Sequence, residues 1–351
     1  MIAVVVLITA PVFLFFHPSN EEHILKIYCA GSLMFPLEKA AEAFEMANPN
    51  INVEIEGHGS IQVIRHVTEL GDQVDLLMVA DYSLISAMMY HTTIPGSSSS
   101  FADWYIRFAG NSIVLAYTDQ SKYNEEIDAQ NWYKILRRPE VKFGFPNPLI
   151  DALGYRSPMV ILLSEEYYKD NEIFDDLVAD NFNPRFTVVD SGDQKAIVVP
   201  ELLAPVGSKV ILRASSVQLL PLLESGAIDY CFLYLSNAQQ YNLEYVELPE
   251  EINLGSFQLQ DQYRKLQIRF EHQRFGSIGL THEGETIYYG LAIPKNAPMP
   301  QLAVEFVEYL FSGEGNDIFA SAHHPIYRPA FTDNRQALPN SLQSLTEEDP
   351  V

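Results

Sequence analysis

The 351-residue chain is long enough for two domains with separate cores, and with 47% hydrophobic and 19% charged residues it is neither disordered nor fibrous. Its 22 Lys and Arg residues against 46 Asp and Glu give a formal net charge of −24, which excludes a diffuse nucleic-acid binder. Its two cysteines, Cys29 and Cys231, lie far apart and in no zinc-binding spacing, which argues against a disulfide framework or a structural zinc site.

An unbroken apolar run occupies residues 2–16, close to the N-terminus. The run is shorter than a membrane span of about 20 residues and is typical of a signal peptide, although no Lys or Arg precedes it. We predict that residues 1–20 are a signal peptide or a retained N-terminal anchor, and a buried helix is the alternative. Both favoured interpretations place the rest of the chain outside the cytoplasmic membrane, secreted or membrane-anchored.

Strand-like and helix-like patterns then alternate along the chain. Apolar runs and alternation predict strands, and apolar residues at helical spacing predict helices. The strands are expected over residues 24–30, 51–55 and 75–80, and the helices over residues 33–47, 60–70 and 82–90. This order predicts a parallel sheet with helices on both faces.

A second α/β set occupies the middle of the chain. Its strands are expected over residues 209–213 and 227–234, and its helices over residues 217–225 and 236–241. The weak, acidic pattern of residues 165–205 predicts a loop-like insertion.

Strand-like residues 112–118 and 286–293 bracket this middle region, which indicates one domain inserted into another around a hinged cleft. We expect lobe 1 to comprise residues 24–110 and 292–333, including a helix over residues 301–313, and lobe 2 to comprise residues 111–291. The polar segment 334–351 is expected to be a flexible tail.

Four short motifs place a small or acidic polar residue directly after a strand, where a helix begins. They are Ala30-Gly31-Ser32-Leu33, Gly57-His58-Gly59-Ser60, Asp151-Ala152-Leu153-Gly154-Tyr155-Arg156 and Ala214-Ser215-Ser216-Val217. A helix N-terminus has unpaired N–H groups and a partial positive charge. Such termini, converging on one point, form a cage of neutral donors for an oxyanion, and this cage can work in an acidic protein that repels anions as a whole.

Each motif alone has a simpler interpretation, because Ser and Asp are common helix N-caps. Ser215 and Gln218 fit a capping box, which leaves Ser216 the freer hydroxyl. Pro221 lies inside the expected helix and suggests a kink. The anion-binding interpretation therefore depends on the set, in which Ser32 and Ser60 follow consecutive strands of one sheet.

Longer segments around these motifs are similar to segments of a known protein family. They are residues 28–33, 56–62, 65–71, 80–85, 147–148, 151, 154–157, 223–226, 228–230, 249, 252–255 and 289–290. In them the chain resembles the archaeal molybdate/tungstate-binding proteins, the extracytoplasmic receptors of ATP-driven oxyanion importers. The resemblance implies a periplasmic-binding-protein type II fold of two doubly wound α/β lobes joined by two crossing strands. It also implies a metal-oxyanion receptor that is not an enzyme, needs no cofactor, acts as a monomer and delivers molybdate or tungstate to an ABC permease.

The resemblance also implies a set of ligand-binding residues. Ser32, with Gly31 before it, and Ser60 bind the anion from one lobe, and Asp151 and Tyr234 bind it from the other. Asp151 is implied to be a carboxylate ligand to the metal, because molybdenum and tungsten can add carboxylate oxygens to their tetrahedral shell of oxo groups. Sulfur cannot do so, and a carboxylate therefore disfavours sulfate.

The chain departs from the family at the second carboxylate. The family's glutamate aligns with Ser216, and Glu224 lies near the other end of the same expected helix. Ala152 and Leu153 also replace the residues that commonly follow the family aspartate. These changes predict that the metal of the bound oxyanion is not fully six-coordinate, or that the oxyanion is bound as an ordinary tetrahedral anion. The alternative is a receptor for another tetrahedral oxyanion, such as sulfate.

Other candidate residues have simpler explanations. A hydrolase that pairs Ser32 or Ser60 with His58 is disfavoured, because His58 lies across a tight turn from Ser60 and no known nucleophile motif is present. His323-His324 has no third metal ligand at a useful spacing. Arg156 is expected to form a salt bridge rather than touch the anion, and Tyr155 is expected to pack.

Overall fold

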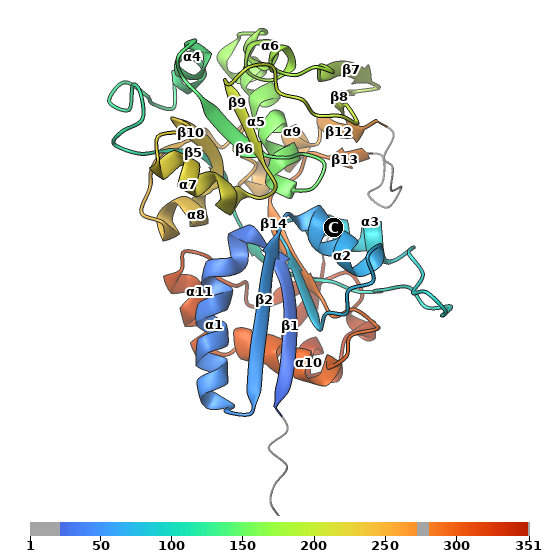
Figure 1. Cartoon of the computed structure of the whole chain (residues 1–351). Coiled ribbons are helices and arrows are strands. Elements are labelled where there is room, and N and C mark those ends of the chain that lie inside the picture. The colour runs from blue at the N-terminus through green and yellow to red at the C-terminus, as the bar shows by residue number, and fades with distance from the viewer. Residues whose placement is uncertain (1–21, 272–280, 350–351) are drawn as a thin grey trace, which may run out of the picture.

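The computed structural model describes residues 22–271 and 281–349 (Figure 1). The expected signal peptide or anchor, over residues 1–20, lies outside the described residues. Within the two described ranges, no helix has the length and apolar composition needed to cross a membrane.

Lobe 1 is built on a seven-stranded sheet in the order β16-β15-β4-β14-β3-β1-β2. The sheet combines β1 and β2, from the N-terminal part of the chain, with β14 from the C-terminal part (Figure 1). The first strands are parallel and β14 runs antiparallel between β3 and β4. The strands are β1 (His23–Ala30), β2 (Ile51–His58), β3 (Leu76–Val79), β4 (Ile106–Gly110), β14 (Tyr288–Ala292), β15 (Ala330–Thr332) and β16 (Thr346–Glu348). The helices that surround them are α1 (Met34–Ala47), α2 (Ser60–Thr68), α3 (Ser83–Met89), α10 (Pro300–Leu310), α11 (Gly313–Ser321) and α12 (Asn340–Gln343), with the 3₁₀ turns η1 (Gly31–Leu33) and η6 (Arg335–Ala337).

Lobe 2 contains a five-stranded sheet in the order β11-β5-β10-β6-β9. Its strands are β5 (Ile113–Tyr117), β6 (Phe143–Pro146), β9 (Val210–Arg213), β10 (Tyr230–Tyr234) and β11 (Glu244–Glu247). Its helices are α4 (Trp132–Arg137), α5 (Ala152–Tyr168), α6 (Ile173–Leu177), α7 (Leu220–Glu224), α8 (Leu235–Gln240) and α9 (Gln260–Tyr263), with the 3₁₀ turns η2 (Ala179–Asn181), η3 (Ser216–Leu219) and η4 (Phe257–Leu259). Residues 152–164 of α5 are all buried, because this helix lies inside the lobe.

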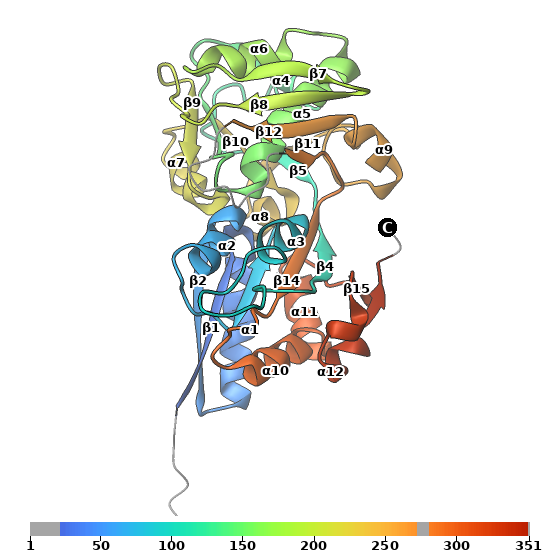
Figure 2. The ribbon, with the colours of Figure 1, turned by 90° about the vertical axis from the view of Figure 1, so that its right-hand side faces the viewer.

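A third sheet covers the outer side of α5 in lobe 2, in the order β13-β12-β8-β7 (Figure 2). Its strands are β7 (Thr187–Ser191), β8 (Gln194–Val199), β12 (Leu266–Phe270) and β13 (Thr281–Glu283). The prediction of a loop over residues 165–205 is therefore wrong, because α6 and the β7–β8 hairpin lie there. β7 is exposed along its whole length and β8 is buried against β12, a strand distant in sequence, so neither shows a clear local pattern.

The chain crosses between the lobes twice. The first crossing is the short segment between β4 and β5, and the second leads from β13 into β14. The two crossings are adjacent, since the amide of Asn111 donates to the carbonyl oxygen of Ile287 at 3.3 Å. The expected lobe boundary at residue 291 falls within β14, which pairs with strands of lobe 1.

The expected flexible tail is a second correction, because residues 335–349 are part of lobe 1. β16 pairs in parallel with β15, and Leu342 of α12 is completely buried. The carboxylate of Asp349 forms an ion pair with buried Arg107 at 2.9 Å. The segment is polar overall, and the few apolar side chains that anchor it are recognisable only once the sheet edge they cover is known.

Leu342→Ala is expected to lower the free energy of unfolding by about 2–5 kcal/mol, because it leaves a cavity beneath α12. Urea unfolding measures this change. Leu202→Ala is the control, since that side chain is 71% exposed and its truncation is expected to have little effect. Equal stabilities of the two variants would show that the C-terminal segment is not anchored to the core.

His324, which follows α11, is a buried histidine whose two ring nitrogens have no hydrogen-bond partner among the described residues. Its ring packs edge-to-face on Tyr289, with centroids 4.4 Å apart. Burial lowers the pKa of His324 to about 3. Within residues 22–271 and 281–349, no cluster of His, Cys, Asp and Glu is placed to hold a metal ion.

The low pKa of His324 predicts acid sensitivity. Between pH 6.5 and about 3 the unfolded chain binds a proton here that the folded chain does not, so stability present above pH 6.5 is lost as the pH falls. The loss is up to about 5 kcal/mol. His324→Leu is expected to reduce the difference between urea unfolding curves at pH 7 and pH 4. The control His91→Leu changes an exposed histidine, and an equal acid response of both variants would contradict the assignment to His324.

Candidate functional site

The four strand-to-helix turns singled out in the sequence meet between the two lobes. Gly31 lies against the fourth turn, because a Cβ atom on it would come within 3.1 Å of Val217 Cγ2 and 3.4 Å of Ser215 Oγ. A Cβ atom on Gly59 would collide with the carbonyl oxygen of Ile150 and lie 2.9 Å from that of Ala214. Both turns of lobe 1 therefore touch turns of lobe 2. At Gly59 the neighbours are backbone atoms, so any larger residue there would collide with them.

The candidate ligand residues all lie at this junction. Ser32 belongs to η1, Ser60 begins α2, Asp151 is the N-cap of α5, Ser216 begins η3 and Tyr234 ends β10. None of the five is more than 5% exposed, and Gly31 beside Ser32 is buried as well. The lobes are thus in contact around these side chains, and the structure has the cleft closed.

The two serines of lobe 1 each accept a hydrogen bond from the protein. The hydroxyl of Tyr289 donates to Ser32 Oγ at 3.0 Å, and the amide of Ala80 donates to Ser60 Oγ at 3.0 Å. The carbonyl of Ser32 is held from lobe 2, by the side-chain amide of Asn237 at 3.1 Å. These contacts fix the orientation of both hydroxyl groups.

Tyr234 of lobe 2 is held in the same way, since Arg156 Nη1 donates to its hydroxyl oxygen at 3.0 Å. None of the three hydroxyls donates to an acceptor among the described residues. Each oxygen is already an acceptor, so its own proton remains for a ligand that offers only acceptors. A fully deprotonated oxyanion is such a ligand.

Asp151 is the one carboxylate in the candidate set. Its Oδ1 accepts the amides of Leu153 at 2.8 Å and Gly154 at 3.3 Å, so it does cap α5. Burial raises the pKa of Asp151 to about 7, although these amides and the charge of Arg156 lower it. A buried carboxylate of this kind is stabilised by a neighbouring positive centre.

The capping interpretation fails for the serines. Gly59 and Ala30 occupy the cap positions of α2 and η1, and Ser215 makes no side-chain cap. Gln218 instead accepts the amide of Ala214 at 3.1 Å. Pro221 does not kink a continuous helix, because η3 ends before it and Pro221 lies in the first turn of α7.

Arg156 forms the salt bridge expected from the sequence, with Asp81 at 3.0 Å. Burial alone raises the pKa of Asp81, but the Arg156 charge and the donors of Tyr155 and Ser83 lower it below its usual value. Packing alone does not describe Tyr155, since its hydroxyl donates to Asp81 across the lobes. Sequence reasoning missed the supporting roles of Tyr289 and Ala80, although both lie in segments that resemble the family.

Two other features are not part of this junction. The ring of His58 stacks on that of His66, with centroids 4.6 Å apart. Nε2 of His58 lies 3.6 Å from the carboxylate of Glu56 and makes no hydrogen bond to Ser60.

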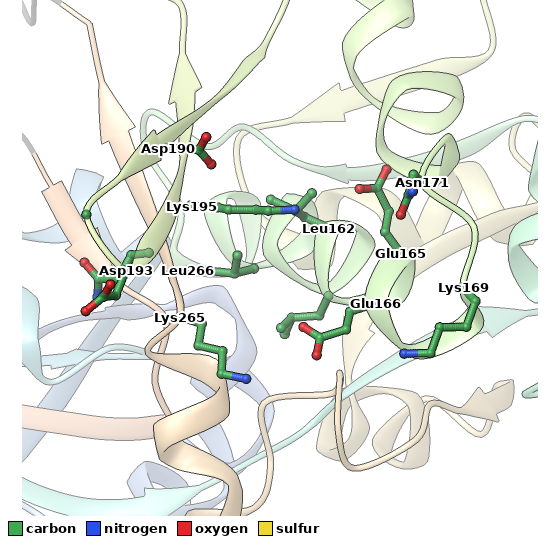
Figure 3. A pocket seen from close by; sticks show the side chains of 13 residues that line it. Leu162, Glu165, Glu166, Lys169, Asn171, Asp190, Asp193, Lys195, Lys265 and Leu266 are labelled. Atoms are coloured by element: carbon green, nitrogen blue, oxygen red, sulfur yellow. The ribbon is translucent and has the colours of Figure 1, made fainter.

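A cavity of about 580 Å³ lies in lobe 2 between α5 and the β7–β8 hairpin (Figure 3). Its lining includes three lysines and four carboxylates, Lys169, Lys195, Lys265, Glu165, Glu166, Asp190 and Asp193. This mixture of charges offers a dianion no net attraction.

Comparison with known proteins agrees with this architecture. A family model described as bacterial extracellular solute-binding protein matches residues 25–323. A solute-binding protein of Methanococcus maripaludis is 40% identical over 323 residues, covering 92% of this chain and 88% of the relative. The molybdate/tungstate-binding protein WtpA of Thermococcus kodakarensis is 36% identical over 336 residues, covering 94% and 89%.

A solved structure supports the fold alone. The periplasmic molybdate-binding protein of Azotobacter vinelandii has a TM-score of 0.54 at 16% identity, covering 87% of this chain and 100% of that one. The type II periplasmic-binding-protein fold and the resemblance to the archaeal proteins are confirmed. The chain belongs to the extracellular solute-binding protein family.

Proposed function

We propose that this protein binds molybdate or tungstate between its two lobes and delivers the anion to the permease of an ABC importer. The observation that carries the proposal is the set of three buried hydroxyls, on Ser32, Ser60 and Tyr234, whose oxygens each accept a protein hydrogen bond. Their protons and the N–H groups of the converging turns are neutral donors. They suit an oxyanion in a protein of net charge −24, where long-range electrostatics oppose binding.

Asp151 favours a metal oxyanion over sulfate. Molybdenum and tungsten can take a carboxylate oxygen as a ligand, so the metal centre compensates the charge of Asp151. Sulfur does not take up that oxygen, and a buried carboxylate beside a sulfate would leave like charges uncompensated. The name of the 36% identical WtpA relative, a molybdate/tungstate-binding protein, points to the same ligand.

Sulfate or another tetrahedral oxyanion is the second candidate, because of Ser216. This residue is buried at the junction where the resemblance implies a second carboxylate. A hydroxyl at this place suits binding of a tetrahedral anion through hydrogen bonds alone. The relative affinities for tungstate and sulfate distinguish the two candidates.

The family is extracellular, so the two lobes are expected to act outside the cytoplasmic membrane. We infer that the lobes open and close about the crossing segments that precede β5 and β14, as a monomer. Closure then removes water from the anion and creates the surface that the permease recognises. The protein thus acts as a receptor and not as an enzyme.

Tungstate and molybdate are expected to raise the melting temperature of the protein, whereas sulfate at the same concentration is expected to raise it much less. Binding to the folded state at about a thousandfold excess over Kd stabilises by about 4 kcal/mol. Thermal unfolding followed by circular dichroism measures the shifts. Equal shifts with sulfate and tungstate would favour the second candidate, and no shift with any of the three anions would contradict both.

Ser60→Ala is expected to weaken tungstate binding about tenfold or more, because it removes a donor to a charged ligand. Calorimetric titration measures the affinity. Ser164→Ala is the matched control: Ser164 is also a fully buried serine, but it donates to Val160 within α5, away from the junction. A similar loss of affinity in both variants would indicate a general effect on stability.

Ser216→Glu is expected to sharpen discrimination, raising the affinity for tungstate relative to sulfate by about tenfold or more. The glutamate adds a second carboxylate, which attracts the metal centre and repels sulfate. Competition titrations of both anions measure the ratio. Ser225→Glu adds the same charge at an exposed position after α7 and is expected to leave the ratio unchanged. An unchanged ratio in Ser216→Glu would place residue 216 outside the coordination shell.

A further inference from the structure

A buried ion pair joins the two lobes beside the candidate ligand residues. Asp81 follows β3 of lobe 1, and Arg156 lies in the first turns of α5 in lobe 2. Their side chains are 4% and 2% exposed, and Arg156 Nη2 lies 3.0 Å from Asp81 Oδ2. Opening of the cleft would separate the two charges, because each belongs to a different lobe.

Asp81 also accepts hydrogen bonds from donors of both lobes. From lobe 2, the hydroxyl of Tyr155 donates to the same Oδ2 that faces Arg156. From lobe 1, the amide and hydroxyl of Ser83 donate to Oδ1 at 3.0 and 2.7 Å. The Ser83 contacts are local and do not depend on lobe 2. Ser83 therefore orients the carboxylate of Asp81 within lobe 1. Arg156 and Tyr155 of lobe 2 would contact it only when the lobes close.

Arg156 connects this pair to the ligand hydroxyls of both lobes. Its Nη1 donates to the hydroxyl of Tyr234 at 3.0 Å and to the carbonyl oxygen of Ala80 at 2.6 Å. The amide of Ala80 in turn donates to Ser60 Oγ. The guanidinium of Arg156 thus contacts the Tyr234 hydroxyl directly. It is linked to the Ser60 hydroxyl through the backbone of Ala80.

We propose that Asp81, Arg156 and Tyr155 form an interlobe latch that assembles only on closure and sets the orientation of Tyr234 and Ser60 for the anion. The inference rests on the proposed function, in that the anion is the ligand enclosed by closure. Arg156 and Asp81 are positioning residues and do not touch the ligand. Because the charges of Arg156 and Asp81 oppose each other, the pair adds little net charge beside the ligand residues.

The energetic consequence falls on the closed form. In the open form both charges are expected to be hydrated, so losing one partner costs little there. In the closed form the remaining charge is buried without its partner, which is strongly unfavourable. Removing one partner of such a desolvated pair mainly accelerates dissociation. The latch therefore predicts a slower release of ligand. In the ligand-free protein it stabilises only the minor closed population, so it contributes little to the melting temperature.

The test uses the full chain with tungstate, by calorimetry for Kd and by thermal unfolding with and without ligand. Asp81→Asn keeps the Oδ1 acceptor for Ser83 and removes the charge. It is expected to raise Kd about 30-fold or more, while the melting temperature of the ligand-free protein stays the same. Tyr155→Phe is expected to weaken binding less, and Arg156→Lys is expected to retain more affinity than Arg156→Gln.

Asp349→Asn is the matched control. Arg107 and Asp349 form an equally buried arginine–carboxylate pair at 2.9 Å, but both belong to lobe 1. This variant is expected to lower the melting temperature with and without tungstate alike and to leave Kd unchanged. If Asp81→Asn behaves like Asp349→Asn, the Asp81–Arg156 pair is a structural contact and the latch is overturned.

The latch and the proposed function can fail separately. If the wild-type protein binds neither molybdate, tungstate nor sulfate, the proposed function fails. The latch is then measured in the ligand-free protein, from the distribution of distances between spin labels placed on the two lobes. Asp81→Asn is expected to deplete the minor short-distance population, which is the closed form of the ligand-free protein. An unchanged short-distance population in the variant would overturn the latch.

Discussion

The close contact of Gly59 with the backbone at Ile150 and Ala214 is the constraint on which the candidate site depends. It brings the start of α2, in lobe 1, against the turns that carry Asp151 and Ser216 in lobe 2. Without this contact, Ser60 would face solvent and the four turns would be four ordinary helix starts. Gly31 lies against the side chains of Ser215 and Val217, so a glycine stands at each of these two places where a turn of lobe 1 meets lobe 2.

Charge is handled locally at this junction. The protein carries a net charge of −24, yet the hydroxyls of the candidate site are arranged as neutral donors. The guanidinium that contacts Tyr234, that of Arg156, is paired with Asp81. Direct coordination of the anion by arginine would give strong attraction with little discrimination among dianions. Under the proposed function, neutral donors with a single carboxylate, Asp151, would make selectivity depend on whether the central atom of the anion can accept that carboxylate.

The fold was predictable where local patterns are strong. β1, α1, β2, α2 and β3 follow the expected order, because these segments bury one face or both faces against a single sheet. The β7–β8 hairpin and the C-terminal strand β16 were not predictable, because their partners β12 and β15 are distant in sequence or short. Exposed edge strands and polar segments show little periodicity, so they resemble loops until their neighbours are known.

The sequence by itself determined the class of fold, the strand-to-helix turns and the residue types at each turn, since these depend on short-range periodicity and on backbone chemistry. It also favoured a salt bridge of Arg156 with an aspartate or glutamate over contact with the anion. Only the tertiary structure decided that Asp81 in the other lobe is that carboxylate, and that Tyr289 and Ala80 direct the hydroxyls of Ser32 and Ser60. These contacts join residues far apart in the chain, and only the meeting of two separately folded lobes brings them within hydrogen-bond distance.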